Sequence, residues 1–289
     1  AVQAVGGTLG IIIPPRIVFV IYGSTNGVSI SKLLMSGMLP GILTAVVLCL
    51  YGYVVAKKEN FPKSFDQFSL KRVLKSLKGA VWALMMPLII LGGIYGGIFT
   101  PTESAMIACA YGLVVSFFVT KELTVKNFFD VVSKTAASTA NVTVMFLAAQ
   151  VFGFLIAYYD ITTTIANFFV AVSPNWIIFM GLVFILLTIT GMFMEVGATN
   201  VILSPLLAPV AAAFGIDPIH FGMVFVFLLA LGQATPPFGS TMFIACGISG
   251  ERVAAVIRRL LPFVLVEYAC ALVFAYVPWF STFLPSLMA

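Results

Sequence analysis

The sequence predicts an all-α polytopic membrane protein that contains two broken helices. Of its 289 residues, 61% are apolar and only 9% are charged, whereas a soluble domain carries about 25% charge. A glycine stands four residues before a proline pair twice inside long apolar runs, as GIIIPP at 10–15 and GQATPP at 232–237. Glycine costs about 1 kcal/mol and proline about 3 kcal/mol relative to alanine in a helix interior. We therefore expect each phrase to interrupt a membrane helix.

The spans follow from apolar runs of about 20 residues, the length with which a helix crosses a bilayer. In chain order, we expect a broken span at 6–24, spans at 34–56, 80–99, 104–120 and 136–157, a pair of runs at 175–196 and 198–214, a second broken span at 218–248 and a last span at 260–278. The polar, amphipathic stretch at 57–79 should lie on the membrane surface. The apolar stretch at 161–172 is too short to cross.

The basic residues set the orientation of these spans. Thirteen of the fifteen lysines and arginines fall in three connections, at 57–78, 121–134 and 252–259. Cytoplasmic connections are enriched in lysine and arginine, so we expect all three to face the cytoplasm. Membrane topology then explains the net charge of +5, and we do not expect the chain to bind nucleic acid.

This orientation constrains the segment before the second broken span. The span at 136–157 must end opposite the cytoplasm, and the second broken span must return to the cytoplasm, so residues 161–214 cross an even number of times. The centre of this segment is MEVGATN at 194–200. A re-entrant hairpin with this polar tip satisfies the constraint and is favoured. Two full crossings also satisfy it, but they place Glu195 and Asn200 in cytoplasmic water without basic neighbours.

The two broken spans run in opposite directions, the first outward and the second inward. The same motif in opposite orientations predicts an inverted repeat of the kind found in secondary transporters. We divide the chain into the end of a first repeat at 1–56, a cytoplasmic connector at 57–79 and a second repeat at 80–289. Because a hairpin precedes only the second break in this sequence, we expect a matching hairpin from upstream of residue 1 or from another chain. Residues 1–289 alone are not expected to fold stably or to transport.

The second break offers oxygen ligands for a cation. The helix that stops there ends in free carbonyls with a partial negative charge, and the next helix begins with free N–H groups and a partial positive charge. Thr235 adds a hydroxyl, and the hairpin tip adds oxygen atoms from Gly197, Thr199 and Asn200. Hard cations prefer such ligands. The alternative is a kink that only packs helices, but the repeated motif beside a polar tip favours a site.

The first break combines close backbone approach with an unusual charge. Gly6, Gly7 and Gly10 lack side chains, and Thr8 supplies one hydroxyl. Arg16 directly follows the prolines, and a cation inside the membrane is a functional hypothesis by default. Arg16 could hold the carboxylate of a substrate or could obstruct the site, and the sequence leaves both alternatives open.

Other polar residues have structural alternatives. Glu195 adjoins the hairpin tip and could orient it or titrate. Glu267 lies in the middle of a span, where an interhelical hydrogen bond is the favoured interpretation. Glu103 fits the first turn of a span with Thr102 as its N-cap. His220, the only histidine, is interpreted as an interfacial capping residue.

The candidate site residues come from the two breaks and the hairpin tip. The candidate cation ligands are Gly6, Gly7, Thr8, Gly10, Gly197, Thr199, Asn200, Gly232 and Thr235. The candidate substrate-binding residues are Thr8, Pro14, Pro15, Arg16, Thr235 and Pro236. The sequence contains no H-E-x-x-H, Walker or Rossmann pattern, so we expect neither an enzyme nor an ATP-hydrolysing protein.

Three stretches resemble the large membrane subunit of TRAP (tripartite ATP-independent periplasmic) transporters: GGIYGGIFTPTESA at 92–105, SPLLAPVAAAFGIDPIHFG at 204–222 and LGQATPPFG at 231–239. The resemblance covers the whole chain and about the C-terminal two thirds of a typical large subunit. It implies a multi-pass protein of the bacterial cell inner membrane that takes up an organic acid by an elevator mechanism coupled to Na⁺. It also implies a small four-helix membrane subunit and a periplasmic substrate-binding protein as partners.

The resemblance further implies sodium sites where hairpin tips meet the broken helices. One site carries over to Gly197, Thr199, Asn200, Gly232 and Thr235, and half of another to Gly6, Gly7, Thr8 and Gly10. The chain departs from the family pattern at Arg16, where a small polar residue commonly follows the first proline pair. Two other functions remain as alternatives: a divalent-anion/sodium symporter that needs no binding protein, and an ion channel.

Overall fold

The computed structural model describes residues 2–60, 69–250 and 252–287, and every element in this part of the chain is a helix. Six of the described helical segments, or seven if one bent pair is counted, are long and apolar enough to cross a membrane. This confirms the prediction of an all-α polytopic membrane protein. The chain divides into two compact units, one formed by Ala1–Val54 with Val144–Ala289 and the other by Val55–Thr143.

The first unit begins with a broken helix, as the sequence predicts. α1 (Val2–Ile12) stops before the first proline pair, and α2 (Ile17–Asn26) starts after it. Proline has no N–H group and clashes with the preceding turn, so a helix does not continue through the pair. α2 ends at Gly27, whose φ of 67° lies in the left-handed region that glycine adopts without a steric penalty.

The span predicted at 34–56 lies within one apolar helical segment, Ile30–Lys58, that is long enough to cross a membrane. α3 (Ile30–Ser36) and α4 (Met38–Lys58) meet at Gly37. A Cβ atom on Gly37 would lie 2.8 Å from the carbonyl oxygen of Ile12 and 2.8 Å from the ring of Phe19. Glycine at this joint therefore allows the chain to pack closely against the first broken helix.

The second broken helix follows a helical pair. α9 (Trp176–Phe193) and α10 (Val196–Ala213) are joined by Met194 and Glu195, inside the predicted tip. α11 (Pro218–Gly232) and α12 (Ser240–Ser249) flank the second proline pair. Both helix breaks therefore occur at the predicted motifs, and the re-entrant path of the α9–α10 pair stays a prediction.

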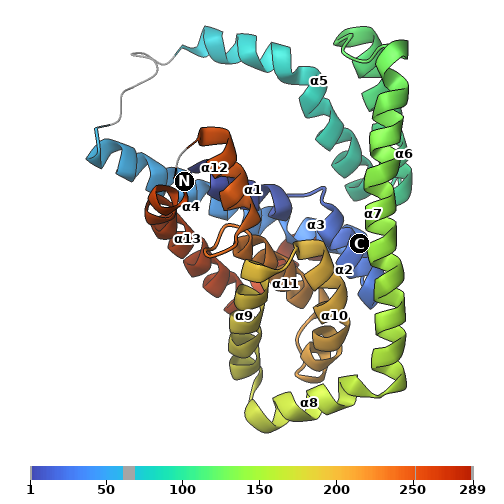
Figure 1. The fold of residues 1–289 in the computed structure, drawn as a ribbon, viewed down its shortest axis with the longest axis vertical. Helices are drawn as coiled ribbons and strands as arrows, with labels where there is room; N and C mark the ends of the chain where they lie inside the picture. The colour runs from blue at the N-terminus through green and yellow to red at the C-terminus, as the bar shows by residue number, and fades with distance from the viewer. Residues whose placement is uncertain (1, 61–68, 251, 288–289) are drawn as a thin grey trace. The chain divides into compact units, whose positions relative to one another are not determined.

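α11 forms the core of the first unit. Every residue from His220 to Gly232 is buried, as expected for a helix that is apolar on all sides. It contacts α1, α2, α3, α9 and α10, and also α13 (Val253–Tyr276) and α14 (Trp279–Ser286). Figure 1 shows α8 (Ile161–Val172) lying across the end of the α9–α10 pair. The last predicted span, 260–278, corresponds to most of α13.

The second unit contains α5 (Leu70–Tyr95), α6 (Pro101–Val114), a π-helical turn (Val115–Val119) and the first part of α7 (Val125–Tyr158). α5 continues without interruption from the predicted connector into the predicted span at 80–99. Residues 61–68 of that connector lie outside the described residues. α6 and the π-helical turn cover the predicted span at 104–120, and α7 covers the predicted span at 136–157.

The start of α6 corrects one assignment made from sequence. The N-cap is Thr100 and not Thr102: the Thr100 side chain accepts a hydrogen bond from the Glu103 N–H group at 3.3 Å, and the Glu103 carboxylate accepts one from the Thr100 N–H group at 2.8 Å. This reciprocal pair is a capping box. Pro101 takes the first helical position, where its missing N–H group costs nothing.

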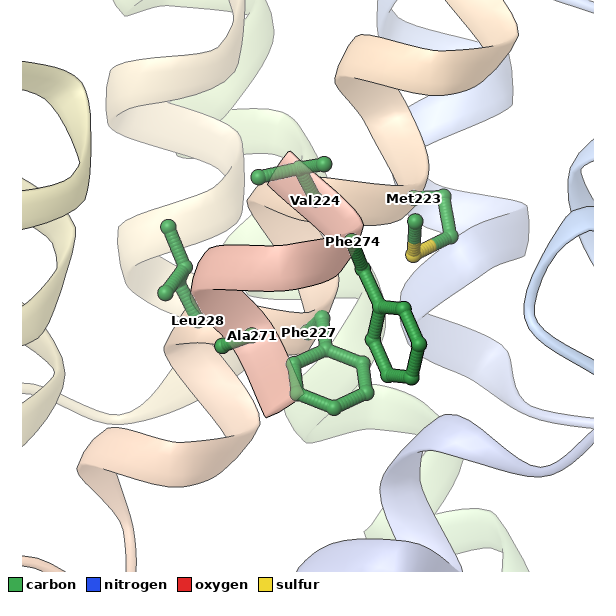
Figure 2. A pocket seen from close by; sticks show the side chains of 6 residues that line it. All are labelled: Met223, Val224, Phe227, Leu228, Ala271 and Phe274. Atoms are coloured by element: carbon green, nitrogen blue, oxygen red, sulfur yellow. The ribbon is translucent and has the colours of Figure 1, made fainter. Parts of the chain in front are cut away.

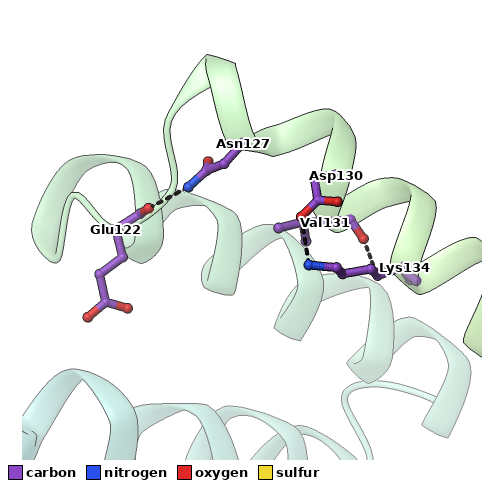
Figure 3. Close-up of polar contacts among 6 residues, drawn as sticks. Glu122, Asn127, Asp130, Val131 and Lys134 are labelled. Carbon is purple, nitrogen blue, oxygen red and sulfur yellow. Dashed lines mark hydrogen bonds and ion pairs between the residues drawn. The ribbon is translucent and has the colours of Figure 1, made fainter.

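The start of α7 is held by short-range polar contacts (Figure 3). Asn127 donates from its side-chain amide to the Glu122 carbonyl at 3.0 Å, and its side-chain oxygen accepts from the Thr124 N–H group at 2.7 Å. One turn later, Lys134 forms an exposed ion pair with Asp130 at 2.7 Å. Exposed pairs of this kind contribute at most about 1 kcal/mol, so they shape a helix end and do not form a site.

Candidate functional site

The second break is a tight contact between two backbones. Gly232, the last residue of α11, lies against Gly191 of α9, and a Cβ atom on Gly232 would come within 2.5 Å of the Gly191 Cα and carbonyl carbon. The contact is with backbone atoms, which cannot rotate away as a side chain could. Glycine at position 232 therefore brings the break directly against the helix that leads to the hairpin tip.

Gln233 links the hairpin to both sides of the second break, a role that was not predicted from the sequence. Its side-chain amide donates to the carbonyls of Gly191 at 3.2 Å and Met194 at 3.0 Å. Its side-chain oxygen accepts a hydrogen bond from the Ser240 hydroxyl at the start of α12. Its backbone carbonyl accepts from the hydroxyl of Thr241 at 2.6 Å and from the Thr241 N–H group at 3.0 Å. A polar amide inside the motif GQATPP was the available signal.

Thr235 lies in the second break, as predicted. Its buried hydroxyl donates to the Leu231 carbonyl at 2.8 Å, which is one of the last carbonyls of α11. The same oxygen lies 3.0 Å from the hydroxyl of Tyr268 on α13. Pro236, next in the chain, is half-buried. Thr235 therefore offers an oxygen atom at the negative end of a helix, the end that favours a cation.

The hairpin tip contacts both broken helices. Gly197, Thr199 and Asn200 are all buried in the first turns of α10. Thr199 donates to the carbonyl of Glu195 at 2.9 Å, and the Glu195 carboxylate accepts from the Ala198 N–H group at 2.9 Å. Glu195 thus caps α10 and orients the tip, which was one of its two predicted roles.

Asn200 extends from the hairpin toward the first broken helix. Its amide donates to the carbonyl of Val18 on α2 at 2.9 Å. Its side-chain oxygen is buried and has no hydrogen-bond partner among the described residues. Asn200 was predicted to lie with Gly232 and Thr235, whereas this contact joins it to the helix that follows the first break.

The polar contacts of the first broken helix centre on Thr8, which lies in α1 before the break. Its fully buried hydroxyl lies 2.6 Å from the Val5 carbonyl and 2.5 Å from the carboxyl of Glu267 on α13. A Cβ atom on Gly7 would lie 3.3 Å from the methyl group of Thr241 on α12, so the first break also approaches the second broken helix. Gly6 is exposed and has no neighbour within 4 Å of such a Cβ atom.

Arg16 lies over the first break with its side chain accessible. Its guanidinium is 3.3 Å from the position that a Cβ atom on Gly10 would take, so glycine at position 10 leaves space for it. The residue is exposed, directly precedes α2 and has extended backbone. Pro14 is buried and Pro15 is half-buried. Arg16 is thus available to an anion.

Two consecutive residues of α13 connect the two breaks. Glu267 contacts Thr8 of the first broken helix, and Tyr268 contacts Thr235 of the second. The predicted interhelical hydrogen bond of Glu267 is therefore present. The role of Tyr268 was not predicted, because a tyrosine in an apolar run gives no periodic signal for a polar contact.

The residues at the breaks fit a hard cation by chemistry. They offer hydroxyl, carboxylate and carbonyl oxygens, and two of the oxygens, on Asn200 and Glu267, are buried without a hydrogen-bond partner among the described residues. A bound water or ion is one of the ordinary explanations for such an atom. Within the described ranges, no group of three or more His, Cys, Asp or Glu side chains could hold a metal.

Two other polar or hollow regions do not contribute to this arrangement. His220 forms hydrogen bonds with the Ser281 hydroxyl at 2.7 Å and the Ala275 carbonyl at 3.1 Å. The capping role predicted for His220 belongs to Asp217, which is the N-cap of α11. A small hollow between α11 and α13 is lined only by apolar side chains, as Figure 2 shows. It offers no group that could bind a charged substrate. Its lining residues are Met223, Val224, Phe227, Leu228, Ala271 and Phe274.

Comparison with known proteins identifies the family to which the chain is similar. A family model described as "Tripartite ATP-independent periplasmic transporter, DctM component" matches residues 1–280. The isethionate TRAP transporter permease protein DctMQ of Oleidesulfovibrio alaskensis is 39% identical over 278 residues, which are 96% of this chain and 44% of that protein. The C4-dicarboxylate TRAP transporter large permease protein DctM of Vibrio cholerae is 35% identical over 302 residues, which cover 98% of this chain and 66% of that protein.

A third relative is the sialic acid TRAP transporter large permease protein SiaM of Vibrio cholerae. It is 33% identical over 279 residues, which cover 96% of this chain and 65% of that protein. The chain thus spans between about half and two thirds of the length of these curated relatives. All three are named as permease proteins of transporters, in agreement with the prediction of a transport protein and not an enzyme.

Proposed function

We propose that this chain, which belongs to the DctM-component family of tripartite ATP-independent periplasmic transporters, carries out sodium-coupled uptake of an organic acid across the bacterial inner membrane. The observation that supports sodium coupling is the pair of broken helices whose threonine hydroxyls both contact α13. Broken helices with free carbonyl and N–H groups are how many secondary transporters bind a cation and an anionic substrate.

The class of substrate follows from charge. Arg16 places an accessible guanidinium at the first break, and guanidinium binds carboxylate and other planar or tetrahedral anions with paired hydrogen bonds. The names of the three relatives include isethionate, C4-dicarboxylate and sialic acid. We infer an organic acid with at least one anionic group as substrate, recognised by Arg16, Thr8, Pro14 and Pro15 at the first break and by Thr235 and Pro236 at the second.

The partners proposed are those of the family. We propose a small membrane subunit beside this chain and a soluble periplasmic protein that delivers the substrate. An elevator movement of the helices that carry the two breaks would move the substrate between the two sides of the membrane. A divalent-anion/sodium symporter without a binding protein and an ion channel are the alternatives.

Uptake by proteoliposomes that contain the complete transporter separates these three functions. We expect saturable uptake of labelled organic acid that requires both the binding protein and external sodium, and that stops when choline replaces sodium. Uptake that needs no binding protein would indicate the symporter. Uptake that does not saturate and follows the membrane potential would indicate a channel, and either result would contradict the proposal.

A further inference from the structure

The carboxyl group of Glu267 lacks the partners that a buried acid needs. The residue is 0% exposed, and one carboxyl oxygen lies 2.5 Å from the Thr8 hydroxyl. The other oxygen has no hydrogen-bond partner within the described part of the chain. A buried polar atom without a partner requires an explanation, and a bound ion is one of the ordinary ones.

The helices packed around α13 provide no positive charge to balance Glu267. α1, α9 and α12 contain no lysine, arginine or histidine. α11 contains only His220, whose two ring nitrogens are bonded to Ser281 and Ala275. α4 carries its basic residues in its last turn. On α13 itself the nearest basic residue is Arg259, about 12 Å along the helix axis from a rise of 1.5 Å per residue.

Three oxygen atoms lie close together around Thr8. The Thr8 hydroxyl lies 2.6 Å from the Val5 carbonyl oxygen and 2.5 Å from the Glu267 carboxyl oxygen. The hydroxyl has a single hydrogen, and neither a carbonyl nor a carboxylate has one to donate. With an ionised carboxyl group, three oxygens share one hydrogen, and a cation among them would relieve their mutual repulsion, whereas a neutral carboxyl group would relieve it by donating its own hydrogen to Thr8.

We propose that Glu267 is the anionic ligand of a monovalent cation bound beside α1, before the first break, with the Thr8 hydroxyl and the Val5 carbonyl as further ligands. One carboxylate balances one positive charge, whereas a divalent ion would leave an excess charge in an apolar interior. Hydroxyl, carbonyl and carboxylate oxygens are the ligands of hard cations. This inference rests on the proposed sodium coupling and identifies the cation as sodium.

The site gives α13 a part in cation binding beyond helix packing. Residues 6–10 alone offer one hydroxyl and backbone carbonyls, with no formal charge to hold a cation in a bilayer. Glu267 supplies that charge from a helix that lies 259 residues away in sequence from Thr8. Tyr268, the next residue, contacts Thr235 at the second break. A cation bound to Glu267 would therefore lie one residue along α13 from a contact with the second break.

Thermal unfolding of the complete transporter tests the site without measuring uptake. The unfolding temperature is recorded against sodium chloride concentration, with choline chloride keeping ionic strength constant. The variant Glu267→Gln keeps the size of the side chain and removes its charge. The matched control is Glu122→Gln, the same change at an exposed loop residue (Figure 3).

We expect sodium to stabilise the wild type and E122Q, and the sodium concentration for half the effect to rise about ten-fold or more in E267Q. Loss of a charged ligand is typically worth that much, since 1.4 kcal/mol is a factor of ten. If E267Q does not assemble, Thr8→Val gives the second measurement: it keeps the carboxylate, removes one ligand and should also weaken the sodium effect. A wild-type sodium response in either assembled variant would overturn the proposal.

The outcomes separate this site from the proposed function. Sodium-dependent uptake together with an unchanged sodium response in E267Q would leave the function standing and contradict the site. Uptake that ignores sodium, together with sodium stabilisation that depends on Glu267, would contradict sodium coupling and leave the site.

Discussion

Thr8 in the first broken helix and Thr235 in the second break each have a buried hydroxyl, and these hydroxyls contact two consecutive residues of α13. A hydroxyl in this position has a structural use, since Thr235 also bonds to the Leu231 carbonyl. It also has a lone pair left for a cation. Mutations that remove one oxygen atom and keep the side-chain shape separate the two uses.

Replacing Thr235 with valine tests its use as a sodium ligand. We expect Thr235→Val to fold and to need several-fold more sodium for half-maximal uptake, because one oxygen ligand is lost from the negative end of α11. The control is Thr190→Val, which removes a hydroxyl that bonds only to carbonyls of its own helix, α9. Equal sodium dependence in Thr235→Val, Thr190→Val and the wild type would exclude Thr235 from the site.

Replacing Arg16 with serine tests whether this residue recognises the substrate or obstructs its path. Because the guanidinium is accessible beside Gly10, we expect Arg16→Ser to raise the KM for the organic acid strongly and to leave the sodium dependence unchanged. Arg258→Ser, which removes an exposed arginine at the start of α13, is the matched control. Faster uptake in Arg16→Ser would instead identify Arg16 as an obstruction.

At the scale of elements, the contact between α9 and α11 depends on two glycines without side chains. The pair joins the helix before the hairpin tip to the helix before the second break, and Gln233 reinforces it with two hydrogen bonds to carbonyls of that region. The hairpin and the broken helix are therefore expected to move as one body if the transporter rearranges.

Replacing Gly232 with alanine tests this contact. The added methyl group would lie 2.5 Å from the Gly191 backbone, so the two helices must separate, and overpacking of this kind costs about 1–3 kcal/mol. Gly247→Ala in α12 is the control, because a Cβ atom there has no neighbour within 4 Å. We expect a lower unfolding temperature for Gly232→Ala only. Equal unfolding temperatures for the two variants would contradict the close packing.

At the scale of the whole molecule, features with local causes were predictable and features with distant causes were not. Glycine and proline disrupt helices through their own backbone, so both breaks could be located from GIIIPP and GQATPP. The partner of Thr8 is on α13, and the partner of Asn200 is on α2. These contacts depend on how helices far apart in sequence pack, and a single sequence does not specify that packing residue by residue.

The N-cap of α6 and the role of Gln233 also show which features a sequence predicts and which depend on the packed structure. Thr100 and Thr102 have similar capping propensity, and the choice between them depends on where Pro101 fits in the first turn. Gln233 was visible as a polar residue in a motif, but its function required knowing that the carbonyls of Gly191 and Met194 lie beside it.

Sodium coupling is the central claim, and the entry of labelled sodium tests it most directly. Proteoliposomes that contain the complete transporter and its binding protein are given labelled sodium outside, with and without an organic acid that is taken up. We predict saturable sodium entry that depends on the organic acid and falls sharply in Thr235→Val. Uptake of the acid without any accompanying sodium entry would contradict the account.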